Sequence, residues 1–167
     1  GLDYHPFPGM GYADKETQKT SFLLQIELAK KLQKPIVLHT READEDTQKT
    51  MTENIPFDFP MDIHCYTASL DFAKWVLEKY PNAYFGFAGV VTFKNAKNVL
   101  DVVKVVPLDK ILLETDAPFM APIPFRGKPS HSGMIPWIAE TIAKTKGVSL
   151  EEVLRQTTIN AKKLFKI

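Results

Sequence analysis

Apolar and polar positions alternate in blocks along this chain. Short apolar runs, rich in β-branched and aromatic residues, are each preceded and followed by a longer amphipathic stretch. Such an alternation of strands and helices favours a parallel sheet with helices outside it, which places the chain in the α/β class. Four strands are expected, over residues 36–39, 61–66, 84–89 and 110–116.

The amphipathic stretches predict the helices. In the first of them Phe22 and Ile26 recur at helical spacing, and the stretch ends before a Lys-Pro pair. Further along, Ser149 and Glu152 form the Ser-x-x-Glu pattern of a capping box, which marks the start of a helix. Six helices are expected, over about 14–32, 41–53, 70–79, 95–105 and 134–146, and from 149 onward.

The composition fits one folded domain over residues 1–167, because 44% of the residues are hydrophobic and 25% are charged. The net charge of +1 provides no general attraction for a polyanion, so any nucleic-acid contact must be local. No run of about 18 apolar residues is present, and no membrane span is expected. The only cysteine, Cys65, excludes an internal disulfide and favours a reducing compartment, which predicts a cytoplasmic protein.

Three of the predicted strands end in a residue that can bind a metal ion. His39, His64 and Asp116 each stand at or near the C-terminal end of a strand. In a parallel α/β barrel this end is where groups from several strands converge. Imidazole nitrogens and a carboxylate suit Zn²⁺, Mn²⁺, Mg²⁺ or a similar divalent ion, without choosing among them. The alternatives are a hydrogen-bonding role in a core for each histidine and a turn-capping role for Asp116.

Five short segments resemble successive motifs of the TatD family of metal-dependent deoxyribonucleases, in that family's order. They are residues 1–4, 35–41, 63–66, 112–118 and 160–165. The resemblance implies a TIM-like (β/α) barrel that hydrolyses phosphodiester bonds in DNA, as a 3′ to 5′ exonuclease, with two divalent metal ions. It also implies that His39 and His64 are metal ligands. Asp116 would be a ligand or the catalytic residue that handles the proton of the attacking water.

The chain departs from the family pattern at its start. The family opens with a His-x-His pair and has a metal-bridging Glu just before the phrase Gly-Leu-Asp, with which this chain begins without an initiator Met. By the family layout the expected strands are about the last four of eight βα units, followed by C-terminal helices, so the fold class is a partial TIM-like barrel. The N-terminal half of the barrel is expected in the same or another chain, with mutual completion by two copies as the alternative.

A deoxyribonuclease also needs groups that bind the phosphates of its DNA substrate, which is expected to be single-stranded. Arg41, Arg126 and Lys128 are candidates for gripping phosphate oxygens, and His131 follows a proline-rich loop over 118–129 that is expected to border the substrate cleft. The alternatives are a helix start at Arg41 and an idle, exposed loop position for His131. Glu114 either orients a metal ligand or accepts a buried ion pair.

Two other classes of function fit the same residues. One is a metallohydrolase of the broader amidohydrolase kind that cleaves C–N or small phosphoester bonds. Many such enzymes carry a lysine that bridges two metal ions, and the sequence offers no candidate for it. The other is a non-catalytic fragment or subunit that lacks the N-terminal ligands. We therefore expect the 167-residue chain alone to be inactive, and the N-terminal half to restore activity if the enzyme hypothesis is right.

Overall fold

Parallel strands form the centre of the fold, as the block pattern predicts. The computed structural model describes residues 1–6 and 13–167. One sheet has the strand order β2-β4-β5-β6, and each strand runs parallel to its neighbour. The bounds of its strands are β2 Ile36–Leu38, β4 Met61–Ile63, β5 Ala83–Phe87 and β6 Ile111–Leu113. Strands that follow one another in the chain are therefore neighbours in the sheet.

Two further strands were not expected from the sequence. β1 (Leu2–Asp3) pairs in parallel with β3 (Thr40–Arg41), and only His39 separates β3 from β2. The backbone N–H of Leu2 donates to the carbonyl of His39 at 3.0 Å, so β1 lies beside the same extended segment that contains β2. The prediction of four strands was wrong here because a strand of two residues is too short to show a period of two in its side chains.

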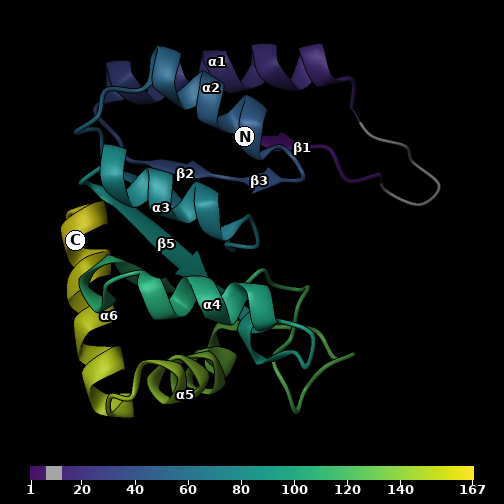
Figure 1. Cartoon of the computed structure of the whole chain (residues 1–167), viewed down its shortest axis with the longest axis vertical. Coiled ribbons are helices and arrows are strands. Elements are labelled where there is room, and N and C mark those ends of the chain that lie inside the picture. Colours follow the sequence, from purple (N-terminus) through teal and green to yellow (C-terminus); the bar gives the residue numbers. More distant parts are fainter. Residues whose placement is uncertain (7–12) are drawn as a thin grey trace.

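All six predicted helices are present and lie around the strands (Figure 1). Their bounds are α1 Lys15–Leu32, α2 Asp44–Asn54, α3 Leu70–Lys79, α4 Lys97–Val105, α5 Ile135–Lys146 and α6 Leu150–Phe165. Short 3-10 turns occur at η1 Gly89–Thr92, η2 Leu108–Lys110 and η3 Ser132–Met134. The predicted start of the second helix at residue 41 was wrong, because Arg41 belongs to β3 and α2 begins at Asp44.

Side-chain caps fix the start of several helices. The Ser69 hydroxyl accepts from the N–H of Phe72 at the start of α3, and the Ser149 hydroxyl accepts from the N–H of Glu152 at the start of α6. Each cap satisfies a backbone donor that the first helical turn leaves unpaired. The second contact is one half of the predicted capping box.

The two faces of the sheet differ in what covers them. Ile63, Phe85 and Ile111 are fully buried on one face, within the core that the helices share. On the opposite face Leu112 packs against Leu164 of α6, while Val37 of β2 is 54% exposed. The partly open second face leads to the strand ends where the candidate site lies.

Of the helices in the described ranges, none combines the length and the apolar surface that crossing a membrane requires.

Candidate metal centre

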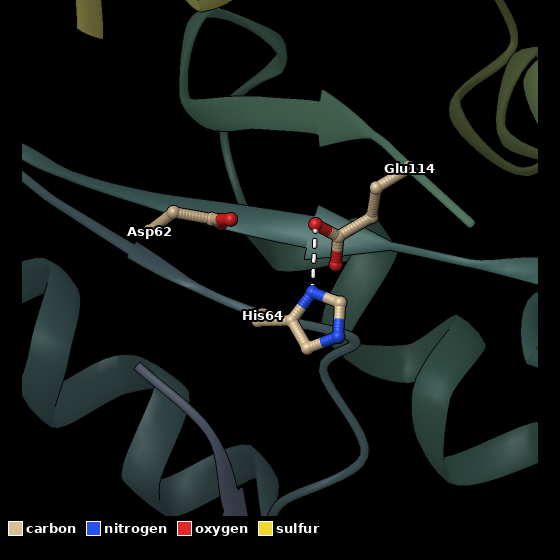
Figure 2. A group of neighbouring side chains, drawn as sticks. All are labelled: Asp62, His64 and Glu114. Atoms are coloured by element: carbon tan, nitrogen blue, oxygen red, sulfur yellow. Dashed lines mark ion pairs between the residues drawn. The ribbon is translucent and has the colours of Figure 1, made fainter. Parts of the chain in front are cut away.

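His64 stands between two carboxylates just beyond the end of β4. Its Nδ1 atom lies 3.0 Å from Oε2 of Glu114, and its Nε2 atom lies 3.5 Å from Oδ1 of Asp116. Figure 2 marks the ion pair between His64 and Glu114 with a dashed line. Both carboxylates follow β6, which is two strands away from β4 in the sheet. The parallel topology thus brings a histidine and two acidic residues together from segments about fifty residues apart.

His39 approaches the same place from the neighbouring segment between β2 and β3. Its ring centroid lies 6.5 Å from that of His64, and its Nε2 atom lies 3.0 Å from Oδ2 of Asp3. The His39 side chain is 48% exposed, whereas that of His64 is 23% exposed. His64 therefore lies near each of the other two residues singled out from the sequence, with His39 beside its ring and Asp116 near its Nε2 atom.

Glu114 is held in position by its neighbours. Its carboxylate accepts a hydrogen bond from the backbone N–H of Cys65, a residue with a left-handed φ of 45°. Gly86 of β5 faces the same carboxylate, and a Cβ atom at this position would collide with it. Glu114 thus fits between β4 and β5 because Gly86 leaves room, and it fixes the ring of His64.

Asp62 lies next to this pair and is almost completely buried. Ligand atoms of Asp62, His64 and Glu114 all lie within 4.8 Å of one another (Figure 2). Burial raises the pKa of the Asp62 carboxyl well above its ordinary value, and the negative charge of Glu114 raises it further. Within residues 1–6 and 13–167, Asp62 Oδ1 has no hydrogen-bond partner. A protonated Asp62 beside a charged Glu114 avoids placing two negative charges together inside the protein.

The surroundings give the two ring nitrogens of His64 different roles. The hydrogen bond to Glu114 is the main reason why the pKa of His64 is raised to about 9. Burial opposes this rise, while the charge of Glu114 adds to it. With a pKa of about 9, both ring nitrogens carry a proton near neutral pH, so that Nδ1–H faces Glu114 and Nε2–H faces Asp116. Nε2 is the nitrogen that would lose its proton to a cation bound between His64 and Asp116.

Three residues of this cluster escaped the sequence-based hypothesis. They are Asp62 of β4, Asp3 of β1 and Gly86 of β5, none of which is among the predicted site residues. The sequence contains a weak physical signal for Asp62 and for Gly86. An aspartate inside an apolar strand is costly unless it has a partner. A glycine inside a strand often marks the close approach of another group.

The other candidate residues lie in different surroundings. Arg41 is half-buried in β3, two residues after His39. The guanidinium of Arg126 lies over the ring of Phe93, 4.2 Å from its centroid, and Lys128 lines the same depression. His131 is exposed and precedes η3. The structure thus separates the candidates into a cluster at the strand ends and a basic group in the loop after β6.

Cys65 is buried and has a free thiol. Its Sγ atom lies 3.8 Å from Sδ of Met120, and burial raises the pKa of its thiol to about 12. A thiol with such a pKa is not ionised near neutral pH and is a poor nucleophile.

Two imidazoles and a carboxylate lie at the strand ends of this parallel α/β sheet, which is where (β/α) barrels have their active sites. The chain is therefore an α/β protein with a candidate metal centre. The family model of the TatD related DNases matches residues 1–166. The chain therefore belongs to the TatD family, as the sequence motifs indicate.

Relatives support the same assignment over the whole chain. YabD of Bacillus subtilis, named an uncharacterized metal-dependent hydrolase, is 42% identical over 167 residues, which are 100% of this chain and 63% of the relative. YcfH of Escherichia coli K12 has the same description and is 39% identical over 100% of this chain and 61% of its own length. The chain thus spans about three fifths of the length of these relatives.

Solved structures show the same fold. The crystal structure of YjjV, a TatD homolog from Escherichia coli, matches 100% of this chain and 62% of its own with a TM-score of 0.82 at 25% identity. A TatD family hydrolase from Entamoeba histolytica matches 99% of this chain and 61% of its own with a TM-score of 0.84 at 21% identity.

Proposed function

We propose that this chain supplies part of the active site of a metal-dependent hydrolase that cleaves phosphodiester bonds in DNA, removing nucleotides in the 3′ to 5′ direction. The observation that carries the proposal is the approach of both His39 and Asp116 to His64 at the strand ends. The names of the relatives support hydrolysis with a metal, and the family model supports DNA as substrate.

The donor set fits a divalent cation. Imidazole nitrogens and carboxylate oxygens are ligands of Zn²⁺ and Mn²⁺, and a ligating histidine commonly donates its second N–H to a carboxylate. His64 has this arrangement, since Nδ1 faces Glu114 while Nε2 faces Asp116. We therefore assign His39, His64 and Asp116 as ligands and Glu114 as the residue that orients His64. Two ions are proposed, as the family resemblance implies.

Each residue then has a defined task in hydrolysis. A divalent ion held by these residues would supply the means to lower the pKa of a water molecule to about 7, so that hydroxide would be available near neutral pH. Asp116 orients the attacking water and accepts its proton, because its carboxylate is the acidic group that faces His64 Nε2. Arg126 and Lys128 stabilise the negative charge that grows on the phosphate oxygens.

The barrel of this hydrolase is proposed to extend beyond these 167 residues. A complete barrel has eight parallel strands, and no open sheet edge remains. Here β1 and β6 are edges, and Val37 is 54% exposed on the face that would point into a barrel. We infer that the other strands and the remaining ligands come from another part of the polypeptide or from a second chain.

The test is an exonuclease assay on the full-length polypeptide that contains this chain. Release of mononucleotides from single-stranded DNA should require a divalent metal ion, stop on chelation with EDTA, and be lost in His64→Ala. His131→Ala is the matched control, since this histidine is exposed in the loop before η3, and the variant should keep most of the activity. Full activity in His64→Ala would overturn the site assignment. Hydrolysis of C–N substrates without any cleavage of DNA would place the enzyme in another class of metallohydrolase.

A further inference from the structure

The loop after β6 forms a depression beside the candidate metal centre. Its volume of about 440 Å³ lies within the range of about 300–1,000 Å³ that is usual for small-ligand sites. Aromatic, basic and small residues line it, and none of them is acidic. The lining residues are Phe93, Pro118, Phe119, Met120, Ala121, Arg126, Gly127, Lys128 and Pro129. We call this depression the loop pocket.

Phe119 presents an unusually open aromatic ring at the loop pocket. It is 67% exposed, whereas aromatic side chains of the core, such as Phe85 and Phe87, are fully buried. An exposed phenylalanine gains nothing from the hydrophobic core. Its ring is available to stack on a flat partner, as aromatic side chains do in proteins that bind single-stranded nucleic acids.

The cations of the loop pocket are arranged for the same kind of ligand. The Arg126 guanidinium lies over the ring of Phe93, 4.2 Å from its centroid, and this cation–π contact favours its place in the lining. Lys128 adds a second positive charge to the lining. A nucleotide combines a flat base with an anionic phosphate, so a pocket with an exposed ring and two cations matches both parts.

Contacts within the loop hold this pocket in shape. The N–H of Ser130 donates to the carbonyl of Pro118 at 2.9 Å and joins the two ends of the loop. The N–H of Ile123 donates to the Thr92 hydroxyl at 2.9 Å. Phe125 packs edge-on against Trp137 of α5, with ring centroids 4.7 Å apart. The loop pocket is therefore largely preformed and does not need to be ordered by its ligand.

Two contacts connect the loop pocket directly to the candidate metal centre. The N–H of Phe119 donates to the carbonyl of Asp116 at 2.7 Å, which closes a turn and places the two Cα atoms within about 7 Å of each other. Met120 contacts Cys65, the residue after His64. In Figure 1 the loop after β6 lies on the side toward which the arrows of β3 and β5 point. A nucleotide in the loop pocket would thus have its phosphate next to the proposed ligands.

A second depression at the strand ends has the opposite charge. It has a volume of about 530 Å³ and contains four acidic residues, Glu42, Asp44, Glu45 and Asp46. A polyanion is repelled there and attracted to the loop pocket, so the charge distribution selects one side of the candidate centre for the substrate strand.

We propose that the loop pocket is a nucleobase-binding subsite, in which Phe119 stacks on a base of a single-stranded DNA substrate while Arg126 and Lys128 bind the adjacent phosphate. This inference rests on the proposed nuclease function and adds the residue that makes binding depend on the base. Since every base has a flat face, the subsite accepts all four bases with little sequence preference.

The test measures binding without cleavage on the full-length polypeptide that contains this chain. The probe is a fluorescent single strand of about ten thymidylates, protected by 3′-terminal phosphorothioate linkages. The comparison strand lacks only the bases of its last two nucleotides. Fluorescence anisotropy should show that the wild type binds the intact strand about tenfold more tightly than the strand without terminal bases.

Variants of exposed phenylalanines assign this preference to one ring. Phe119→Ala should bind both strands equally, and Phe119→Trp should keep the preference. Phe57→Ala is the matched control, because Phe57 is 61% exposed but precedes β4, at the other end of the strands. It should keep the tenfold preference. Unchanged thermal unfolding of Phe119→Ala would show that the fold is intact.

Equal binding of both strands by the wild type, or an unchanged preference in Phe119→Ala, would overturn the base subsite. Parallel assays with unprotected strands separate this result from a failure of the proposed function. Cleavage without a base preference would refute the base subsite and support the nuclease function. A base preference that depends on Phe119, without cleavage, would support the subsite and refute the nuclease function.

Discussion

Glu114 determines how His64 is presented at the candidate centre. Its carboxylate pairs with Nδ1 of His64 at 3.0 Å and accepts from the backbone N–H of Cys65. Gly86 provides the space that the carboxylate fills. These contacts keep Nε2 of His64 directed toward Asp116. The affinity of the site for a metal ion should therefore depend on Glu114, although Glu114 need not touch the ion.

Glu114→Gln should lower the affinity for Mn²⁺ by roughly 10- to 100-fold. The amide can keep the volume and the bond to Cys65, but it donates to Nδ1 of His64 and favours the tautomer whose Nε2 carries the proton. Isothermal titration calorimetry on the full-length polypeptide measures the change. Glu42→Gln is the control, because Glu42 also pairs with a histidine, His5, at 2.6 Å in an exposed position. Equal affinities of Glu114→Gln and the wild type would refute the orienting role.

Gly86→Ala should weaken Mn²⁺ binding in the same way, because the added methyl group displaces the carboxylate of Glu114. The effect should be much smaller when Glu114 is already alanine, since the crowded group is then absent. A double-mutant cycle of the two substitutions measures this coupling. Independent, additive losses would show that Gly86 acts in another way.

The sequence predicts the candidate ligands better than it predicts what holds them. His39, His64 and Asp116 follow apolar strands, and parallel strands bring their ends together whatever the rest of the chain does. The role of Gly86 depends on the register of β5 with β6, in which Gly86 lies opposite Leu112. Such a register is a tertiary property, and the order of residues within either strand does not reveal it.

At the level of secondary-structure elements, Asn160 fastens α6 to the last strand. Its side-chain amide is buried and donates to the carbonyls of Leu108 and Ile111, at 2.9 and 2.8 Å. Leu108 lies just before β6, and Ile111 is the first residue of this strand, which leads to Glu114 and Asp116. The motif that includes Asn160 was noted in the sequence only as part of the family resemblance, and the structure gives it a physical role.

Asn160→Ala should reduce the free energy of unfolding by about 2–3 kcal/mol, because two buried carbonyls lose their donor. Urea denaturation of the full-length polypeptide gives this value. Thr158→Ala on the same helix is the control, since Thr158 is exposed and bonds only within α6. It should change the stability by no more than about 0.5 kcal/mol. A similar small effect at Asn160 would contradict the account.

Asp46 of α2 connects Tyr4, the residue after β1, with Lys19 of α1, and it should make stability depend on pH. It accepts from the hydroxyl of Tyr4 at 2.6 Å and pairs with Lys19 at 3.1 Å, and these contacts lower its pKa below the ordinary 3.8. A lowered pKa in the folded state means that the contribution is complete above 3.8 and is lost as the pH falls through the folded-state pKa.

Asp46→Asn should therefore cost about 0.5–1 kcal/mol of unfolding free energy near neutral pH, since the pair is partly exposed. The cost should disappear at a pH well below 3.8. Urea denaturation at both pH values tests this. Glu45→Gln removes a charge from the same turn of α2 without touching Tyr4, and it should show a smaller pH-dependent loss. A cost that persists in acid would mean that the charge is irrelevant.

The helices and the main strands follow from local patterns, whereas β1 and β3 do not. Ser69 and Ser149 mark helix starts because a hydroxyl can accept from an N–H of the first turn. Arg41 looks like a helix start because polar residues follow it, but the pairing of Tyr4 N–H with its carbonyl keeps it in a strand. That pairing comes from a segment nearly forty residues earlier, so no local pattern contains it.

At the level of the whole molecule, the position of the proposed ligands depends on a sheet whose edges remain open within this chain. β1 and β6 each have one unpaired side in the described part of the structure, and the inner face next to Val37 is half covered. Open edges and uncovered apolar surface favour association with further strands. The proposed barrel and its missing ligands would come from those strands.

The 167-residue chain alone should therefore release no nucleotides from single-stranded DNA with Mn²⁺ present. Addition of the separately produced N-terminal half of the full-length polypeptide should restore activity, because it closes the barrel and adds the missing ligands. Co-elution in gel filtration and the exonuclease assay measure the two effects. Full activity of the isolated chain would show that its own residues are sufficient.

The most direct test of the account is the location of a bound metal ion in crystals of the full-length polypeptide grown with Mn²⁺ or Zn²⁺. An anomalous difference map should show a peak about 2.0–2.2 Å from Nε2 of His64 and from donor atoms of His39 and Asp116. A peak enclosed by Asp62, Glu114 and Nδ1 of His64, or no peak near His39 and Asp116, would contradict it.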